Sequence, residues 1–329
     1  MSGVPRLSVV VATYNRPRLL ERLLSQLAQQ TLARDDYEVV VVDDGSVPPV
    51  SGALPPLSLP LALTLLEVPN GGAATARDLG VRRAQGAIVV ILDDDMQVGP
   101  GFLAAHLALH DAGARRVVLG HIRPDPGLAR MPLFERYHAA MLDRWVAGVR
   151  DGKTAIQGSD LCTGNVSFPR AEYLEVGGFD PSLRRSEDAE IGVRFQKAGL
   201  HLVFGSEAFS LHGSDHSRLA VWMQRAYLYG VFDRRIARKH PEVASADPHR
   251  FFSLVHPLSR PFLVTAAVAP ALGYVLARVA ILASLGVDRL GLERLGIAGA
   301  TLAYGIEYFR GVRAEAGSAR ATLRPAAVR

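Results

Sequence analysis

The sequence has a single cysteine, Cys162, among its 329 residues. One thiol excludes an internal disulfide and a cysteine-based zinc cluster, and it fits a reducing cytoplasm. The N-terminal segment, MSGVPRLSVVVATYN, also lacks the charged region, apolar region and small-residue cleavage site of a secretory signal. We therefore expect the N-terminal part of the protein to stay in the cytoplasm. The chain also lacks internal repeats and low-complexity tracts.

The composition is that of a folded, basic protein. Hydrophobic residues make up 49% of the chain and charged residues 21%, which is enough apolar material to bury a core. The length suits one large α/β domain with an appendage, or two modest domains. The formal net charge of +5 suits nucleic acid, anionic lipid or phosphorylated substrates, and it does not choose among them.

Short β-branched runs alternate with helical patterns near the N-terminus. Buried strands are expected at residues 7–12, 38–42, 61–68 and 87–92, and helices at about 19–27 and 70–84. This alternation predicts parallel strands joined by right-handed crossovers. Ligands of such open sheets bind beyond the carboxyl ends of the strands. Two acidic turns, at residues 43–44 and 93–95, fall at that position.

The turn Asp93-Asp94-Asp95 is a candidate metal site. Carboxylates packed this closely repel each other by several kcal/mol per pair at an effective dielectric constant of ~20. A divalent cation removes the repulsion, and Mg²⁺ or Mn²⁺ typically takes one or two carboxylates plus phosphate oxygens. The alternative is an exposed acidic loop. His212 is a further candidate ligand, although a lone histidine is more often a core or surface residue.

Three side chains are candidates for binding a nucleotide. Asp44 could accept a hydrogen bond from a base or a ribose hydroxyl, or it could simply belong to a strand-ending turn. Tyr14 offers an aromatic face to a nucleobase, and its alternative is packing at the edge of the core. Arg77 could approach a diphosphate, or it could lie on a solvated helix face.

Glu187 and Asp188 begin a predicted helix. Acidic residues in a first turn are stabilised by the helix dipole, which is the simpler interpretation. The functional alternative is a general base that removes the proton from an attacking hydroxyl.

Together these segments resemble the family 2 glycosyltransferases, which have the GT-A fold. The matching segments are SVVVATYNRP (8–17), VVVVDDGS (39–46), NGGAATARD (70–78), QGAIVVILDDD (85–95), GNVSFPR (164–170), GGFDPSL (177–183) and SEDAEIGVRFQKAG (186–199). Any one of them is weakly specific, but the ordered series across about residues 7–215 is highly specific.

The resemblance implies an α/β fold of the GT-A (Rossmann-like) type, with a mostly parallel mixed sheet flanked by helices. The catalytic domain would cover residues 1–216, with a nucleotide-sugar half to about 110 and an acceptor half at about 111–216. Residues 217–329 would form a basic and apolar helical region.

The resemblance also implies roles for individual residues. The nucleotide would contact Ala12, Tyr14, Asp44, Arg77, Asp93 and Asp94. Metal ligands would be Asp95, the favoured direct ligand, with Asp93 and His212. Asp188 matches the catalytic base, and the acceptor would contact Glu187, Gly164 and Asn165. The sequence departs from the family at Asp78, where asparagine is usual.

The implied reaction is an inverting transfer of a sugar from a nucleotide diphosphate to an acceptor hydroxyl. Uridine diphosphate is the favoured carrier, with thymidine and guanosine forms as alternatives, and Mn²⁺ is favoured over Mg²⁺. A retaining double displacement would need a nucleophilic carboxylate, which the family comparison does not supply.

The C-terminal third combines arginines with apolar runs at residues 262–287 and 295–306. The first run is long enough to cross ~30 Å of hydrocarbon as a helix. It contains Pro270 and Arg278, and a charge at mid-bilayer costs ~2.5–3.5 kcal/mol. We favour peripheral or monotopic association with the cytoplasmic side of a bacterial-type membrane. By family analogy, the acceptor would be a lipid-linked or cell-surface glycan, as in cell-envelope polysaccharide synthesis. The alternative is a soluble cytoplasmic protein with a helical subdomain.

Other functions fit the sequence less well. A sugar-phosphate nucleotidyltransferase would show a glycine-rich, basic loop after the first strand, where this chain has ATYNRP. A degenerate nucleotide-binding or membrane-binding module would not need both Asp95 and Asp188. Nucleic acid is not an expected partner, because the arginines lie beside an apolar run rather than among stacking aromatic residues.

Overall fold

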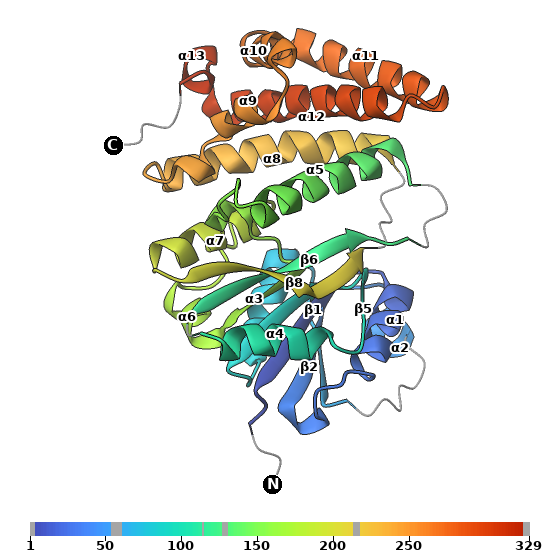
Figure 1. Cartoon of the computed structure of the whole chain (residues 1–329), viewed down its shortest axis with the longest axis vertical. Coiled ribbons are helices and arrows are strands. Elements are labelled where there is room, and N and C mark those ends of the chain that lie inside the picture. The colour runs from blue at the N-terminus through green and yellow to red at the C-terminus, as the bar shows by residue number, and fades with distance from the viewer. Residues whose placement is uncertain (1–3, 54–60, 114, 127–130, 213–217, 325–329) are drawn as a thin grey trace. The chain divides into compact units, whose positions relative to one another are not determined.

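The computed structural model describes residues 4–53, 61–113, 115–126, 131–212 and 218–324 (Figure 1). Its contacts divide the chain into two compact units. The first contains residues 1–127 and 155–214, and the second contains residues 128–154 and 215–329.

An eight-stranded mixed sheet forms the first unit, in the order β3-β2-β1-β4-β7-β6-β8-β5 (Figure 1). Its strands are β1 (Leu7–Thr13), β2 (Tyr37–Asp43), β3 (Leu63–Glu67), β4 (Ile88–Asp93), β5 (Met96–Val98), β6 (Arg116–Pro124), β7 (Asn165–Pro169) and β8 (His201–His212). Strands β1 to β4 run parallel, β7 is antiparallel to β4 and β6, and β8 is parallel to β6 but antiparallel to β5. The predicted α/β architecture with a mixed sheet is confirmed.

The central strands form because valine and isoleucine runs suit a sheet that is covered on both faces. Residues Val9, Val10 and Val11 of β1 are fully buried, as are Val89, Val90 and Ile91 of β4. The strands expected from the sequence around these runs agree with the observed ones to within two residues at each end.

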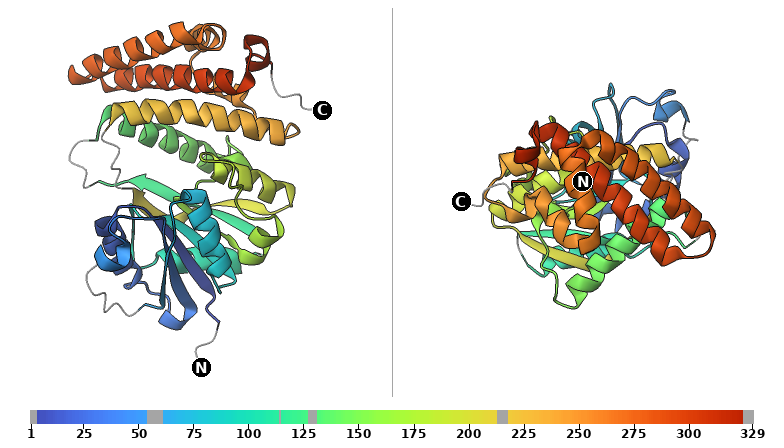
Figure 2. Two further views of the ribbon diagram at one scale, coloured as in Figure 1. Left: turned by 180° about the vertical axis from the view of Figure 1, so that it is seen from behind. Right: turned by 90° about the horizontal axis from the view of Figure 1, so that it is seen from above.

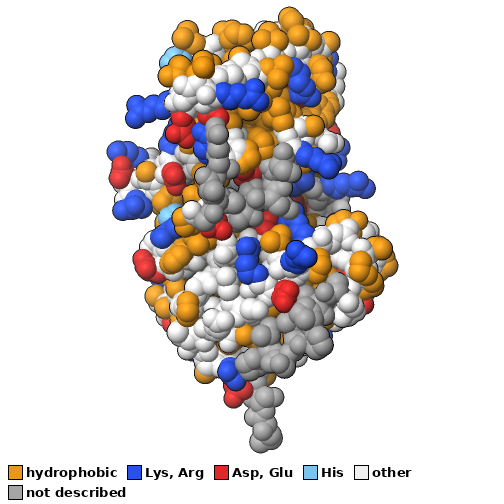
Figure 3. All heavy atoms as spheres, turned by 90° about the vertical axis from the view of Figure 1, so that its right-hand side faces the viewer, with side chains coloured by type: hydrophobic (Ala, Val, Ile, Leu, Met, Phe, Trp, Pro, Cys, Tyr) orange, Lys and Arg blue, Asp and Glu red, His pale blue; other side chains and the backbone are white. Residues whose placement is uncertain are grey.

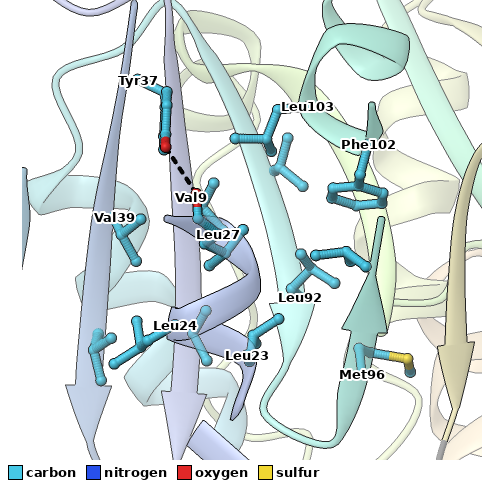
Figure 4. Packing of buried hydrophobic residues seen from close by; sticks show 14 of the residues in the cluster. Val9, Leu23, Leu24, Leu27, Tyr37, Val39, Leu92, Met96, Phe102 and Leu103 are labelled. Atoms are coloured by element: carbon cyan, nitrogen blue, oxygen red, sulfur yellow. Dashed lines mark hydrogen bonds between the residues drawn. The ribbon is translucent and has the colours of Figure 1, made fainter. Parts of the chain in front are cut away.

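Helices cover the sheet of the first unit (Figure 2). They are α1 (Pro17–Leu27), α2 (Val50–Ala53), α3 (Ala73–Arg83), α4 (Phe102–Asp111), α6 (Arg170–Glu175) and α7 (Glu187–Lys197), with 3₁₀ turns η1 (Arg34–Asp36) and η2 (Gly158–Asp160). Leu20, Leu23, Leu24 and Leu27 of α1 are buried. Figure 4 shows the last three against β1 and β2. The Tyr37 hydroxyl donates to the Leu27 carbonyl over 2.7 Å, which satisfies a carbonyl at the helix end.

The second unit is helical. It contains α5 (Leu133–Arg150), α8 (Leu219–Lys239), α9 (Phe251–Leu254), α10 (Arg260–Val268), α11 (Pro270–Arg289), α12 (Glu293–Ala316), α13 (Ala319–Thr322) and the 3₁₀ turns η3 (Ala244–Ala246), η4 (Pro248–Arg250) and η5 (Pro257–Ser259). Helix α5 therefore groups with the C-terminal helices, although it precedes strands β7 and β8 in the chain.

The apolar run at residues 262–287 is two helices rather than one. Helix α10 ends at Val268 and α11 begins at Pro270, which has no N–H to continue the helical hydrogen bonds and disfavours a helical conformation at Ala269 (φ −126°, ψ 75°). Within the described residues, α11 is the one helix long and apolar enough to cross a membrane, with a mean hydropathy of 1.7 and 22% of its apolar window buried.

The charge inside this run is neutralised within the unit. Arg278 donates to Glu307 of α12 over 3.0 Å, and its guanidinium lies 4.4 Å from the centre of the Tyr274 ring. Glu307 is 2% exposed and also pairs with Arg310. The cost expected for Arg278 in an apolar environment is therefore offset by a partner that the sequence pattern did not identify.

Two glycines bring α8 and α12 into close contact. A Cβ added at Gly230 would lie 1.9 Å from the Tyr308 carbonyl oxygen, and one added at Gly311 would lie 1.9 Å from the Tyr227 carbonyl oxygen. Because both obstacles are backbone atoms, the helices must move apart to admit even a methyl group.

We predict that Gly230→Ala and Gly311→Ala each destabilise the protein by at least ~1 kcal/mol, despite alanine's higher helix propensity. The matched control is Gly286→Ala in α11, where an added Cβ meets nothing within 4 Å. Urea unfolding followed by circular dichroism should show a lower midpoint for the first two variants only. Equal midpoints for all three would contradict the close contact.

Candidate active site

The acidic turns meet at one edge of the sheet, as predicted. The register pairs Thr13 with Asp43 and Ala12 with Asp93, so β1, β2 and β4 end side by side. Tyr14 follows β1 and is 49% exposed, which leaves its ring accessible to a planar ligand.

Asp43 and Asp44, the first two acidic residues of this edge, stabilise turns by accepting backbone hydrogen bonds. Asp43 accepts the backbone N–H groups of Ser46 and Val50 over 3.0 and 2.9 Å. Asp44 is 5% exposed and accepts the N–H groups of Gly71 and Gly72 over 2.7 and 3.0 Å. Asp44 therefore fixes the turn that begins α3, and its contact with a nucleobase stays a prediction.

Arg77 links three elements. Its helix lies close to the sheet, since a Cβ added at Gly80 would lie 2.4 Å from a methyl group of Val10. Its two terminal nitrogens donate to Asp93 over 2.5 Å and to Glu187 over 2.8 Å. Burial disfavours the charged form, but these two carboxylates outweigh it and raise the pKa of Arg77. The side chain is 10% exposed, so it does not lie on a solvated helix face.

Arg16 neutralises the middle of the acid triplet. Its Nη1 lies 3.1 Å from a carboxylate oxygen of Asp94 and 3.1 Å from one of Asp95. The Thr13 hydroxyl also donates to Asp94 over 2.8 Å. Burial still raises the pKa of Asp94 to about 6, because Arg16 and Thr13 oppose it only in part.

These contacts exclude an exposed acidic loop, since Asp94 and Asp95 are 4% and 5% exposed. Arg16 is not among the residues that the sequence motifs indicate. Its place in the turn after β1, at the same sheet edge as three carboxylates, could have indicated that it pairs with them.

Strand pairing brings His212 to the triplet. Met96 of β5 pairs with His212 of β8, and His212 Nε2 lies 3.6 Å from Asp95 Oδ2. Two of the three predicted metal ligands are therefore neighbours, whereas the carboxylate of Asp93 is bound by Arg77. In the described ranges, no group of three or more histidine, cysteine or acidic side chains is arranged to hold a metal ion.

The start of α7 places Asp188 beside this cluster. The helix packs closely on η2, where a Cβ added at Gly192 would lie 2.0 Å from the Gly158 carbonyl oxygen. Ser186, just before the helix, adopts a left-handed conformation with φ of 57°, a strained backbone of the kind that often marks functional sites. Burial and then the adjacent Glu187 raise the pKa of Asp188 to about 7. Such a carboxyl can take up or release a proton near neutral pH.

The predicted acceptor residues lie at different depths. A Cβ added at Gly164 would lie 3.4 Å from Asp93 Oδ2, so Gly164 borders the acid cluster. Asn165 is 1% exposed, and its amide nitrogen donates to the Ala208 carbonyl and the Ser210 hydroxyl. The Asn165 side chain is therefore buried and bonded to β8, which differs from the position expected for a residue that contacts the acceptor.

His106, which the sequence motifs do not indicate, completes this buried network. His106 of α4 lies 2.9 Å from the Asn165 side-chain oxygen and 2.8 Å from the Ser167 hydroxyl. Burial lowers its pKa to about 3, so it is neutral and serves to fix β7. Nothing in the helical pattern of α4 marks it.

The departure from the family at Asp78 has a structural explanation. Asp78 accepts the Tyr173 hydroxyl over 2.7 Å and an Arg82 N–H over 2.7 Å. It therefore joins α3 to α6, while the neighbouring Arg77 contacts Asp93 and Glu187.

Comparisons with known proteins show which family the chain belongs to. The family profile described as glycosyl transferase family 2 matches residues 8–147, and that of glycosyl transferase family group 2 matches residues 88–304. Validoxylamine A glucosyltransferase of Streptomyces hygroscopicus subsp. jinggangensis is 31% identical over 267 residues, covering 74% of this chain and 63% of that protein. Hyaluronan synthase of Pasteurella multocida is 27% identical over 223 residues, covering 59% of this chain and 23% of that protein. The chain thus spans less than two thirds of the length of these relatives.

Solved structures share the fold. A mannosyltransferase of Pyrobaculum calidifontis in complex with GDP-Man and Mn²⁺ aligns with a TM-score of 0.58 at 23% identity, covering 90% of this chain and 86% of that one. TarS 1–349 of S. aureus in complex with UDP-GlcNAc aligns with a TM-score of 0.52 at 19% identity, covering 89% of each chain. These likenesses confirm the predicted GT-A fold. With a family profile matching residues 88–304, well over half of its length, the chain belongs to the family 2 glycosyltransferases.

Proposed function

We propose that the protein is an inverting glycosyltransferase that moves a sugar from a nucleotide diphosphate to an acceptor hydroxyl. The observation that carries the proposal is Asp188, a carboxyl whose pKa is raised to about 7 beside the acid cluster at the sheet edge. Family membership supports the reaction class. The first unit would be the catalytic domain.

The nucleotide would bind at the ends of β1 and β2, against the exposed ring of Tyr14 and near Ala12 and Asp44. Uridine diphosphate is our favoured carrier, and a neighbouring structure in complex with UDP-GlcNAc supports it. A second neighbour is in complex with GDP-Man, so guanosine diphosphate is the main competitor.

The residues present fit a divalent cation. Asp95 and His212 offer a carboxylate and an imidazole close together, and both are ligands that Mn²⁺ accepts. Such ions are usually held by one or two carboxylates with phosphate oxygens, which suits a pair of protein ligands. We propose that Asp95 and His212 hold the ion, with Asp93 nearby. When bound, it would offset the negative charge of the diphosphate leaving group.

In the proposed mechanism, the acceptor oxygen attacks the anomeric carbon as the bond from that carbon to the diphosphate oxygen breaks. Asp188 takes the hydroxyl proton, and the nucleoside diphosphate leaves from the opposite face, so the configuration inverts. Arg77 holds Glu187 and Asp93 close to Asp188 through its two ion pairs. Gly164 leaves room there, because any side chain would approach Asp93 and Met96.

We predict that Asp188→Asn lowers kcat by a factor of ~10²–10⁴, the usual contribution of a general base. Affinity for the nucleoside diphosphate should stay nearly unchanged, because the amide preserves shape and the base lies on the acceptor side. Sugar transfer and calorimetric nucleotide binding measure the two effects. Asp35→Asn, on an exposed turn of the first unit, is the matched control.

The same variant should be more stable than the native protein above pH 7. The pKa of Asp188 in the folded protein lies above its ordinary value of 3.8. At a pH between these two pKa values, the folded protein therefore binds more protons than the unfolded chain does. Stability from this group is therefore lost as pH rises from ~4 to ~7, and asparagine removes that loss. Near-normal turnover, or a lower melting temperature at pH 8, would contradict the assignment.

We further propose that the second unit binds the cytoplasmic surface of a membrane, where the acceptor would be a lipid-linked or cell-surface glycan. Figure 3 shows hydrophobic side chains gathered on the surface of its helices. Leu272, Val275, Val279 and Leu282 of α11 are 51–65% exposed and recur every three or four residues, which places them on one face. Arg235 and Arg238 pair with Glu315, so the proposal rests on this apolar stripe rather than on basic charge.

We predict that the native protein sediments with phosphatidylglycerol vesicles and that Val279→Asp lowers the bound fraction several-fold. Val221→Asp is the control, since Val221 is also exposed but lies on α8. Equal binding by both variants would exclude the stripe. A native protein that remains in the supernatant at low salt would exclude membrane binding.

A further inference from the structure

Arg16 contacts the same carboxylate oxygen as His212. Asp95 Oδ2 lies 3.1 Å from Arg16 Nη1 and 3.6 Å from His212 Nε2. The same Arg16 nitrogen also donates to Asp94 over 3.1 Å. Arg16 is thus the counter-ion of the two buried carboxylates at the proposed metal site.

A divalent cation and the Arg16 guanidinium compete for this oxygen. A cation bound by Asp95 Oδ2 and His212 Nε2 would carry two positive charges next to the arginine nitrogen. Charges of the same sign at contact distance repel strongly in a partly buried site. A cation at this oxygen therefore weakens the contact between the guanidinium and Asp95.

The chain next to Arg16 is held by hydrogen bonds, whereas the Arg16 side chain is partly exposed. The preceding residue, Asn15, is locked to the neighbouring turn, because its N–H donates to the Ser46 hydroxyl and its side-chain oxygen accepts the Val47 N–H, each over 2.8 Å. The Arg16 side chain is 33% exposed, whereas that of Arg77 is 10% exposed and bound to two acids. A guanidinium at this edge also suits phosphate oxygens, which it binds in a forked, bidentate geometry.

We propose that Arg16 couples the two ligands: it occupies the acid pair until a metal ion binds, and it then transfers to the diphosphate of the donor. The proposal rests on the nucleotide-sugar function given above. It implies that the metal binds weakly alone, because it must displace a paired arginine. It also implies positive cooperativity, since the diphosphate gives that arginine a new partner.

The test measures Mn²⁺ binding by calorimetry with and without uridine diphosphate, in the native protein, Arg16→Gln and Arg18→Gln. Arg18 is the matched control, because it is exposed on the first turn of α1. Without nucleotide, we expect Arg16→Gln to bind Mn²⁺ at least ~10-fold more tightly than the native protein does. The factor by which uridine diphosphate increases Mn²⁺ affinity should be at least ~10-fold smaller in Arg16→Gln than in the native protein. Arg18→Gln should match the native protein.

Thermal melting with and without Mn²⁺ gives a second readout. Arg16→Gln leaves two buried carboxylates without their arginine, so Mn²⁺ should raise its melting temperature more than that of the native protein. Arg16→Lys keeps the charge and should resemble the native protein. Mn²⁺ affinity in Arg16→Gln that is equal to or weaker than native would overturn the coupling while leaving the proposed function intact. If neither the native protein nor any variant binds Mn²⁺ or the nucleotide, the coupling and the proposed function are both overturned.

Discussion

The arrangement of the site depends on one buried arginine. Arg77 joins α3 to the end of β4 through Asp93 and to the start of α7 through Glu187. These acids come from distant parts of the chain and would repel each other without a shared cation. Removing one partner of such a buried pair typically costs ~3–5 kcal/mol, because a charge is left uncompensated. The position of Asp188, one residue after Glu187, therefore follows from Arg77.

The acidic residues at the sheet edge divide into two groups with different tasks. Asp43 and Asp44 accept backbone N–H groups and hold turns, which is ordinary structural work for a carboxylate. Asp95 and Asp188 lie beside titratable or cationic neighbours and are the proposed chemical groups. Close packing of Gly192 against η2 adds to the ion pair between Arg77 and Glu187 in holding the start of α7.

The sequence predicted the features that depend on local pattern. Valine-rich runs identified β1, β2 and β4, and the rule for open sheets placed both acidic turns at one edge. Features that depend on tertiary contacts escaped prediction. The burial of Asn165 and the partner of Arg278 depend on contacts that the spacing of the residues in the sequence does not predict. The pairing of Arg16 with Asp94 is indicated only by the sheet edge that the two residues share. Pro270 interrupts the apolar run of the sequence, and in the structure it separates α10 from α11.

The central claim is that this acidic edge binds a metal ion and a nucleoside diphosphate. Its most direct test is calorimetric titration of the native protein with uridine, guanosine and thymidine diphosphates, each with and without Mn²⁺. We predict tight binding of one diphosphate, uridine diphosphate first among them, and a marked loss of that binding when Mn²⁺ is withheld. A protein shown to be folded that binds none of the three would contradict the account.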